Sequence, residues 1–222
     1  MFDEFVKLIP QDLLQKSGAV FYSGRKAFST PSSLYILGLN PGGSPTEMAD
    51  YTVAKHTEEV LISKPEYWSE YKDEVWRGNS PGTSGMQPRV LHLLRQIHLD
   101  PQKVPASNVI FERSAREKDI TNRFQKLAEP CWPFHQAVIE KLGARVVLCF
   151  GQHSGFWVRE RLDANTFVEE FVEKNNRHWK SVTYKNSSGI AVVVATHPSI
   201  ADWTNSATDP SQLVKRILDV QT

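Results

Sequence analysis

The sequence predicts an α/β protein: a three-layer αβα sandwich around a central, mostly parallel four-stranded sheet. Four short apolar runs are candidate buried strands, near residues 34–38, 104–108, 145–150 and 190–195. Helical patterns separate most of these runs, which is the order expected when helices connect parallel strands. In such a sheet a ligand binds beyond the carboxyl ends of the strands, so the residues that follow each run are candidate site residues.

In the first half of the chain, the apolar residues of 2–16 have helical spacing, which Pro10 interrupts. The strand at 34–38 follows a stretch rich in serine and proline. Residues 87–99 carry apolar side chains on one side of an expected helix, and 104–111 is expected to be extended.

In the second half, we expect helices over 119–128, 133–142, 154–162 and 166–175. Gly143 follows the second of these, where glycine commonly ends a helix. Residues 181–185 and 190–195 form a hairpin-like pair. Asp209 is the expected cap of a last helix, with Pro210 in its first turn.

Length and composition indicate one domain over residues 1–222. The chain is 40% hydrophobic and 23% charged, with a net charge of +1 at pH 7. These values suit a single globular domain, and any surface for nucleic acid must be a local patch. A long polar segment, 44–80, interrupts the strand and helix pattern. We expect it to be a lid over the end of the first strand.

Cys131 and Cys149 are the only cysteines. Two thiols cannot build a disulfide framework or a four-thiolate metal site, so we expect no metal and no cofactor. The N-terminus does not resemble a signal peptide, and no apolar segment has the length of a membrane span. We therefore expect a cytoplasmic protein, monomeric and without a membrane partner.

Polar residues follow three of the four expected strands. They are Gly-Leu-Asn-Pro-Gly at 38–42, Ser-Asn at 107–108 and Thr-His-Pro-Ser at 196–199. Because the carboxyl ends of parallel strands share one edge, we expect these residues to converge. The glycines allow the main chain to approach a ligand closely. The sequence contains neither a phosphate loop nor the nucleophile elbow of a serine hydrolase.

The "GLNPG" at 38–42, paired with "HPS" at 197–199, resembles the two signature motifs of the uracil-DNA glycosylase superfamily. The asparagine in the first motif is similar to that of the mismatch-specific and single-strand-selective branches. Residues 84–114 and 129–151 are similar to the iron–sulfur branch. The resemblance spans residues 34–203 without the 44–80 segment.

Two positions depart from the iron–sulfur branch. Cys131 matches one of its four cluster cysteines, Glu112 replaces another, and the N-terminal pair is missing, so no cluster is expected. Ser80 aligns with the aromatic residue that stacks on uracil in that branch. Either Tyr51 or Trp76 takes over this base contact, or the pocket admits a larger base.

The resemblance implies a monofunctional DNA glycosylase of base excision repair, a hydrolase that removes uracil or a related deaminated or modified base after base flipping. By the same resemblance, Asn40 orients the attacking water and His197 donates a hydrogen bond to O2 of the leaving base. Asn108 pairs with N3–H and O4 of uracil, since a side-chain amide both donates and accepts.

Further contacts follow from the resemblance. Backbone N–H groups near Leu39, Gly42 and Gly43 are expected to contact the base or a phosphate. The candidate DNA-contacting residues are Ser199, Ile200, Trp203, Arg113 and Arg116. Ile200 or Trp203 is in place for a wedge that fills the gap left by the flipped base. The loop 112–126 has five Lys/Arg against three acids, and either tracks phosphates or is a solvated charged face.

Two other functions stay open at this point. One is a weakly active or inactive glycosylase fold that binds a nucleobase or nucleic acid. The other is a glycosylase for a bulkier modified base, consistent with the missing aromatic residue and the long 44–80 segment. Whether the DNA is single- or double-stranded is also open.

Overall fold

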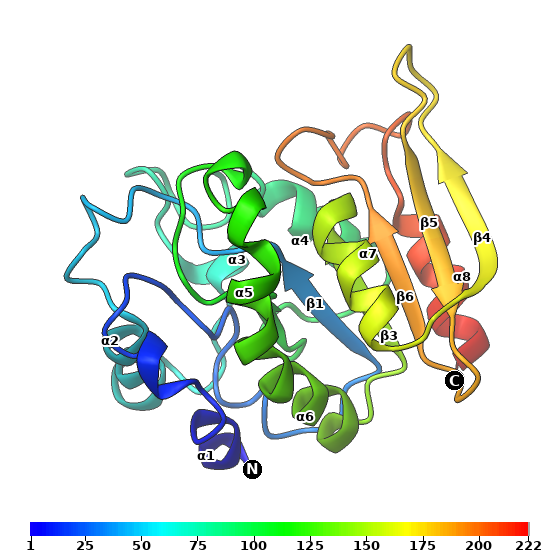
Figure 1. Ribbon diagram of the computed structural model, residues 1–222. Coiled ribbons are helices and arrows are strands. Elements are labelled where there is room, and N and C mark those ends of the chain that lie inside the picture. Colours follow the sequence, from blue (N-terminus) through cyan, green and yellow to red (C-terminus); the bar gives the residue numbers. More distant parts are fainter. Residues whose placement is uncertain (222) are drawn as a thin grey trace.

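The computed structural model describes residues 1–221 and has a mixed six-stranded sheet with helices on both faces (Figure 1). The strands are β1 (Leu34–Gly38), β2 (Ala106–Asn108), β3 (Val146–Phe150), β4 (Thr166–Val172), β5 (Lys180–Lys185) and β6 (Ala191–Ala195). Their order in the sheet is β2-β1-β3-β6-β5-β4. The first four in this order pair in parallel, whereas β5 pairs antiparallel with both β6 and β4.

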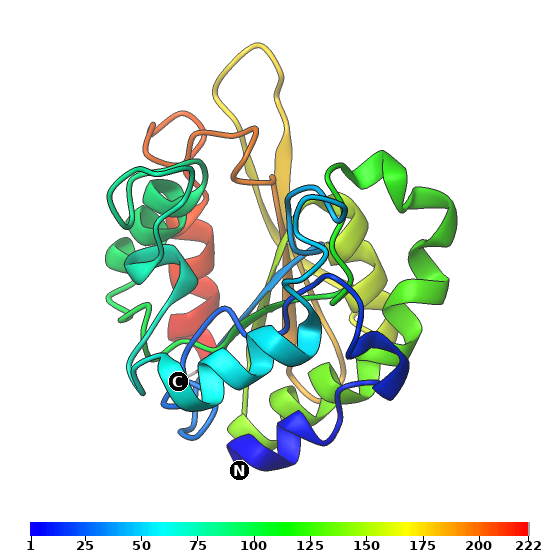
Figure 2. The same ribbon diagram turned by 90° about the vertical axis from the view of Figure 1, so that its left-hand side faces the viewer.

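The helices are α1 (Phe2–Val6), α2 (Val53–Glu58), α3 (Glu70–Asp73), α4 (Gln87–Gln96), α5 (Phe124–Ala128), α6 (Trp132–Leu142), α7 (Gln152–Arg161) and α8 (Ser211–Gln221). Short 3₁₀ turns cover Gln11–Leu13, Glu117–Asp119, Thr121–Arg123 and Glu129–Cys131, and a π turn at Glu59–Ser63 extends α2. In Figure 2, α4 and α8 lie on one side of the sheet and α5 and α7 on the other.

The central strands are buried on both faces, so alternate residues enter two separate cores. Tyr35 and Leu37 of β1 join the core beneath α1, α6 and α7. Leu34 and Ile36 join the core beneath α4 and α8. Strands of this kind are continuous apolar runs in the sequence, which explains why β1, β3 and β6 were predicted close to their observed positions. The short edge strand β2, Ala-Ser-Asn, lies within the segment expected to be extended.

The expected four-stranded sheet is wrong in number by two strands: β5, the expected hairpin partner of β6, joins the sheet, and β4 lies where a helix was expected at 166–175. The segment is rich in phenylalanine and valine, which suit a strand. It is an edge strand and mostly exposed, so its two central acids, Glu169 and Glu170, remain partly in contact with solvent. Glu170 pairs with Lys180 at 2.9 Å across the β4–β5 ladder.

The 44–80 segment packs against both cores of the domain. Val53 and Trp68 are buried in the first core, and Tyr71 is buried in the second. A segment anchored in both cores is held by the same hydrophobic burial as the rest of the domain.

Both cysteines are free and buried. Burial raises the pKa of the Cys131 thiol to about 12 and also raises that of Cys149. Within residues 1–221, no group of three or more histidine, cysteine, aspartate or glutamate side chains is placed to hold a metal ion. None of the helices in this part of the chain has the length and apolar character needed to span a bilayer.

Candidate active site

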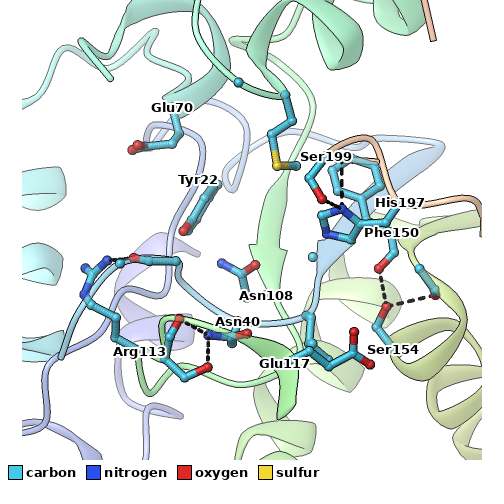
Figure 3. Close-up of a pocket in the computed structure, with 18 of the residues that line it drawn as sticks. Tyr22, Asn40, Glu70, Asn108, Arg113, Glu117, Phe150, Ser154, His197 and Ser199 are labelled. Carbon is cyan, nitrogen blue, oxygen red and sulfur yellow. Dashed lines mark hydrogen bonds between the residues drawn. The ribbon is translucent and has the colours of Figure 1, made fainter. Parts of the chain in front are cut away.

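A cleft of about 1510 Å³ lies at the carboxyl edge of the parallel strands (Figure 3). Asn40, Asn108 and His197 all line it, each placed just after or at the end of a parallel strand. The predicted convergence of these three residues is therefore confirmed. Their chemical roles remain predictions.

Asn108 presents a buried donor that has no partner. The residue is 4% exposed, and Nδ2 makes no hydrogen bond to an acceptor within the described chain, although it lies near enough to the Tyr22 hydroxyl to lower the pKa of that group. Its Oδ1 lies against Gly38, where a Cβ atom would overlap it. Leaving a buried amide donor unpaired costs about 1–3 kcal/mol, so its presence in the cleft points to a ligand that completes it.

Gly38→Ala should lower the free energy of unfolding by roughly 1–3 kcal/mol, because the new methyl group forces the Asn108 amide or β1 to move. Urea unfolding measures this. Gly42→Ala is the control, since a Cβ at Gly42 meets no atom within 4 Å. If Gly38→Ala is as stable as Gly42→Ala, the Asn108 amide is not held in place by Gly38.

The amide of Asn40 has one possible orientation. Its Nδ2 donates to the carbonyl oxygen of Pro41 at 2.8 Å and to Oγ and the carbonyl oxygen of Ser114 at 3.0 and 3.3 Å. Carbonyl oxygens only accept, so the nitrogen must point toward them and Oδ1 is left for the cleft. An amide oxygen accepts a hydrogen bond but does not take a proton at neutral pH. Asn40 is therefore suited to orienting a water molecule.

The ring of His197 has a defined tautomer. Its Nδ1 faces Ser199, lying 3.1 Å from the backbone nitrogen and 2.7 Å from Oγ. The backbone N–H only donates, so Nδ1 accepts and the proton of the neutral ring is on Nε2. Burial lowers the pKa of His197, opposed by the charge of Glu117. At neutral pH, Nε2–H is thus an uncharged donor, and Figure 3 shows it pointing toward the space that Asn40 and Asn108 border.

Ser199 was expected to contact DNA, but both of its donors are directed at His197. It therefore positions the imidazole. Sequence reasoning missed this role, although the Ser two residues after His in "HPS" was the available signal.

The glycine turn after β1 is supported from behind by Arg113. The guanidinium donates to the carbonyl oxygen of Gly42 and, through Nε, to Ser17 Oγ at 3.2 Å. Arg113 is only 7% exposed, which contradicts the prediction that it tracks phosphates. The N–H groups of Gly42 and Gly43 line the cleft and have no hydrogen-bond acceptor in the described structure, so they remain available to a ligand.

The other proposed base contacts are in the cleft wall. Leu39 lines the cleft next to Asn40. Tyr51 and Trp76 also line it. The Tyr51 hydroxyl donates to the carboxylate of Glu59, and Trp76 Nε1 donates to that of Glu70, both at 2.6 Å. Both rings are partly buried, and their orientation is determined by these bonds.

The two wedge candidates have different environments. Trp203 is fully buried in the second core and donates from Nε1 to the carbonyl oxygen of Thr196 at 3.2 Å. This contradicts the hypothesis that it inserts into DNA. Ile200 is 57% exposed at the cleft rim, as a wedge requires. Arg116 is also exposed at the rim.

Sequence reasoning missed Glu70 and Tyr22, which face the cleft beside Asn108 (Figure 3). Burial, with a smaller contribution from Glu74, raises the pKa of Glu70 to about 7, although the hydrogen bond from Trp76 opposes this. Burial, and then the charge of Glu70, also raises the pKa of Tyr22. Glu70 is one of many acids in the 44–80 segment, and no local pattern distinguishes it from the solvated ones.

Glu70→Gln should change how stability depends on pH. The folded protein keeps the Glu70 proton up to about pH 7, whereas an ordinary glutamate releases it near 4.5. The neutral carboxyl therefore favours the folded state at low pH, and this contribution is lost as pH rises from about 4.5 to 7. Above this window the variant should be more stable than wild type by about 3 kcal/mol.

Urea unfolding across this pH window tests the Glu70 prediction. Burial lowers the pKa values of His56 and His135 to about 3, so acid weakens wild type and variant alike through these rings. Only the difference between the two proteins reports on Glu70. Glu66→Gln, at an exposed glutamate, is the control. Parallel stability curves for wild type and Glu70→Gln would contradict the prediction.

No known protein-family model matches the chain, and no curated protein is significantly similar to it. The fold and the site themselves define the class: an α/β protein with a polar cleft at the carboxyl edge of its sheet. Two amides and one neutral imidazole face a common space in that cleft.

Proposed function

We propose that this protein is a DNA glycosylase that hydrolyses the N-glycosidic bond of uracil or a related deaminated or modified base. The observation that carries the proposal is the set of free groups in the cleft: Asn108 Nδ2, His197 Nε2–H and Asn40 Oδ1. The motif resemblance to the uracil-DNA glycosylase superfamily supports it. So do β1, β2, β3 and β6, which pair in parallel within the mixed six-stranded sheet.

Asn108 is the proposed reader of the base. An imide edge presents an N–H donor beside a carbonyl acceptor, and one side-chain amide complements both. The unpaired Nδ2 would donate to O4 while Oδ1 accepts from N3–H. Because the donor is already desolvated, a base that cannot accept from it is rejected rather than merely bound less well.

His197 and Asn40 are the proposed catalytic residues. As the bond between C1′ and the base nitrogen breaks, its electron pair goes to the base and the sugar acquires oxocarbenium character. The Nε2–H of His197 would stabilise the negative charge that develops on O2. Asn40 Oδ1 would orient the water whose oxygen bonds to C1′, and the water proton passes to solvent or to the released base.

A bulkier base is the second candidate substrate. The cleft volume of about 1510 Å³ exceeds what a single pyrimidine needs, and Glu70 adds a carboxyl group that uracil recognition does not require. The partner is DNA in either case. One copy of the chain contains all the proposed site residues, in keeping with the expected monomer.

Single-turnover cleavage of end-labelled oligonucleotides tests the proposal. The panel contains uracil, hypoxanthine, xanthine, modified cytosines and, as the negative control, thymine, and alkali reveals abasic sites. We expect at least one altered base to be released and thymine to be retained. If no base is released although the protein binds DNA, the chain is a recognition module rather than a glycosylase.

A further inference from the structure

The β4–β5 hairpin extends beyond the sheet at the edge where the parallel strands end (Figure 1), and its residues Trp179 and Lys180 line the cleft at that edge. Its connecting loop, residues 173–179, is well bonded rather than loose. The backbone N–H of Glu173 donates to the carbonyl oxygen of Trp179 at 2.8 Å and closes the loop. The N–H of Lys174 donates to the carbonyl oxygen of Ala207, also at 2.8 Å, and attaches the loop to the body.

Arg177 connects this loop to the segment that carries His197. Its guanidinium lies 3.9 Å from the ring centre of Trp179. Its Nη2 binds the buried carboxylate of Glu173 at 3.0 Å, and its Nη1 donates to the carbonyl oxygen of Ile200 at 2.8 Å. The position of the indole is thus coupled to the loop that follows the catalytic histidine.

Trp179 is 39% exposed and lines the cleft rim together with Ile200. Arg177 covers one ring face, and within residues 1–221 no aromatic ring packs against the indole. Three exposed basic side chains surround it: Lys174, Arg177, which pairs with buried Glu173, and Lys180, which pairs with Glu170. A supported, exposed aromatic face next to cations is the combination that binds bases and phosphates of a single strand.

We propose that Trp179 is a stacking platform for an unpaired base that neighbours the base in the cleft, so that the preferred partner is single-stranded DNA. That the cleft itself holds a base rests on the proposed function. In a duplex each base already stacks on both sides, so the indole has no free base face to cover. In a single strand the face is free, and stacking on an aromatic side chain is insensitive to sequence.

Fluorescence anisotropy with a labelled, undamaged single-stranded oligonucleotide tests the proposal, with the same strand in a duplex for comparison. Trp179→Ala should weaken single-strand binding roughly tenfold and leave the weaker duplex binding almost unchanged. Trp179→Phe keeps a stacking face and should recover most of the affinity. Phe167→Ala is the matched control, because Phe167 is an exposed aromatic residue on β4 that does not line the cleft.

The proposal would be overturned by single-strand binding of Trp179→Ala equal to that of wild type, by an equal loss in Phe167→Ala, or by tighter wild-type binding to duplex than to single strand. Binding of neither form by wild type would overturn it as well. The test is separate from the glycosylase assay. If binding depends on Trp179 but no base is released, this proposal stands and the proposed function is refuted. If a base is released but Trp179→Ala binds single-stranded DNA as tightly as wild type, the proposed function stands and this proposal is refuted.

Discussion

The His197→Ala variant should release the base about 100- to 1000-fold more slowly than wild type in single turnover. The lost group is an uncharged Nε2–H donor whose tautomer Ser199 determines. In the proposed reaction this donor would meet charge that appears mainly as the glycosidic bond breaks, so the rate should fall much more than the affinity for DNA. Rapid quench of a uracil-containing oligonucleotide, with binding measured in parallel, separates the two quantities.

Ser199→Ala is the matched variant for this experiment. It removes the Oγ contact at 2.7 Å but keeps the backbone N–H that also binds Nδ1. We therefore expect a loss far smaller than that of His197→Ala. A His197→Ala variant that cleaves as fast as an active wild type would show that the imidazole has no part in leaving-group stabilisation.

Asn108→Asp should lower the single-turnover rate on uracil by at least about 100-fold and also damage discrimination between bases. A carboxylate accepts hydrogen bonds but has no donor, so it repels O4 of uracil and tolerates the amino group of cytosine. Misfolding would slow cleavage of uracil and cytosine equally and leave the ratio of the two rates unchanged. A fall in the ratio of uracil to cytosine cleavage therefore reports on base recognition.

Asn122→Asp, at an exposed position of the 112–126 loop, is the control for the added charge. It should leave both rates close to those of wild type. If Asn108→Asp keeps the wild-type preference for uracil over cytosine, the base is read by other residues, of which Glu70 and Tyr22 are the nearest candidates in the cleft wall.

The sequence was most informative where burial on both faces produces continuous apolar runs. That pattern located β1, β3 and β6, while the short edge strand β2 lies within the predicted extended segment 104–111, and the parallel arrangement then requires the polar C-terminal residues to meet at one edge. It failed at β4, where an exposed edge strand with two central acids has no continuous run to detect. It also failed for Trp203, because local position after "HPS" does not indicate whether a side chain turns outward or into the core.

The sequence by itself determined the α/β class, the four parallel strands and the placement of Asn40, Asn108 and His197 at one edge of the sheet. Only the tertiary structure decided the state of each group. The Asn108 amide packs against Gly38, which has no Cβ to displace it, and the hydrogen bond to Ser114 orients the Asn40 amide. Burial raises the pKa of Glu70. These contacts join residues distant in the sequence, whereas periodicity reports only which face a residue shares with its near neighbours. The direction of a donor or the protonation of an acid depends on the atoms packed against it, and those are known only once the chain has folded.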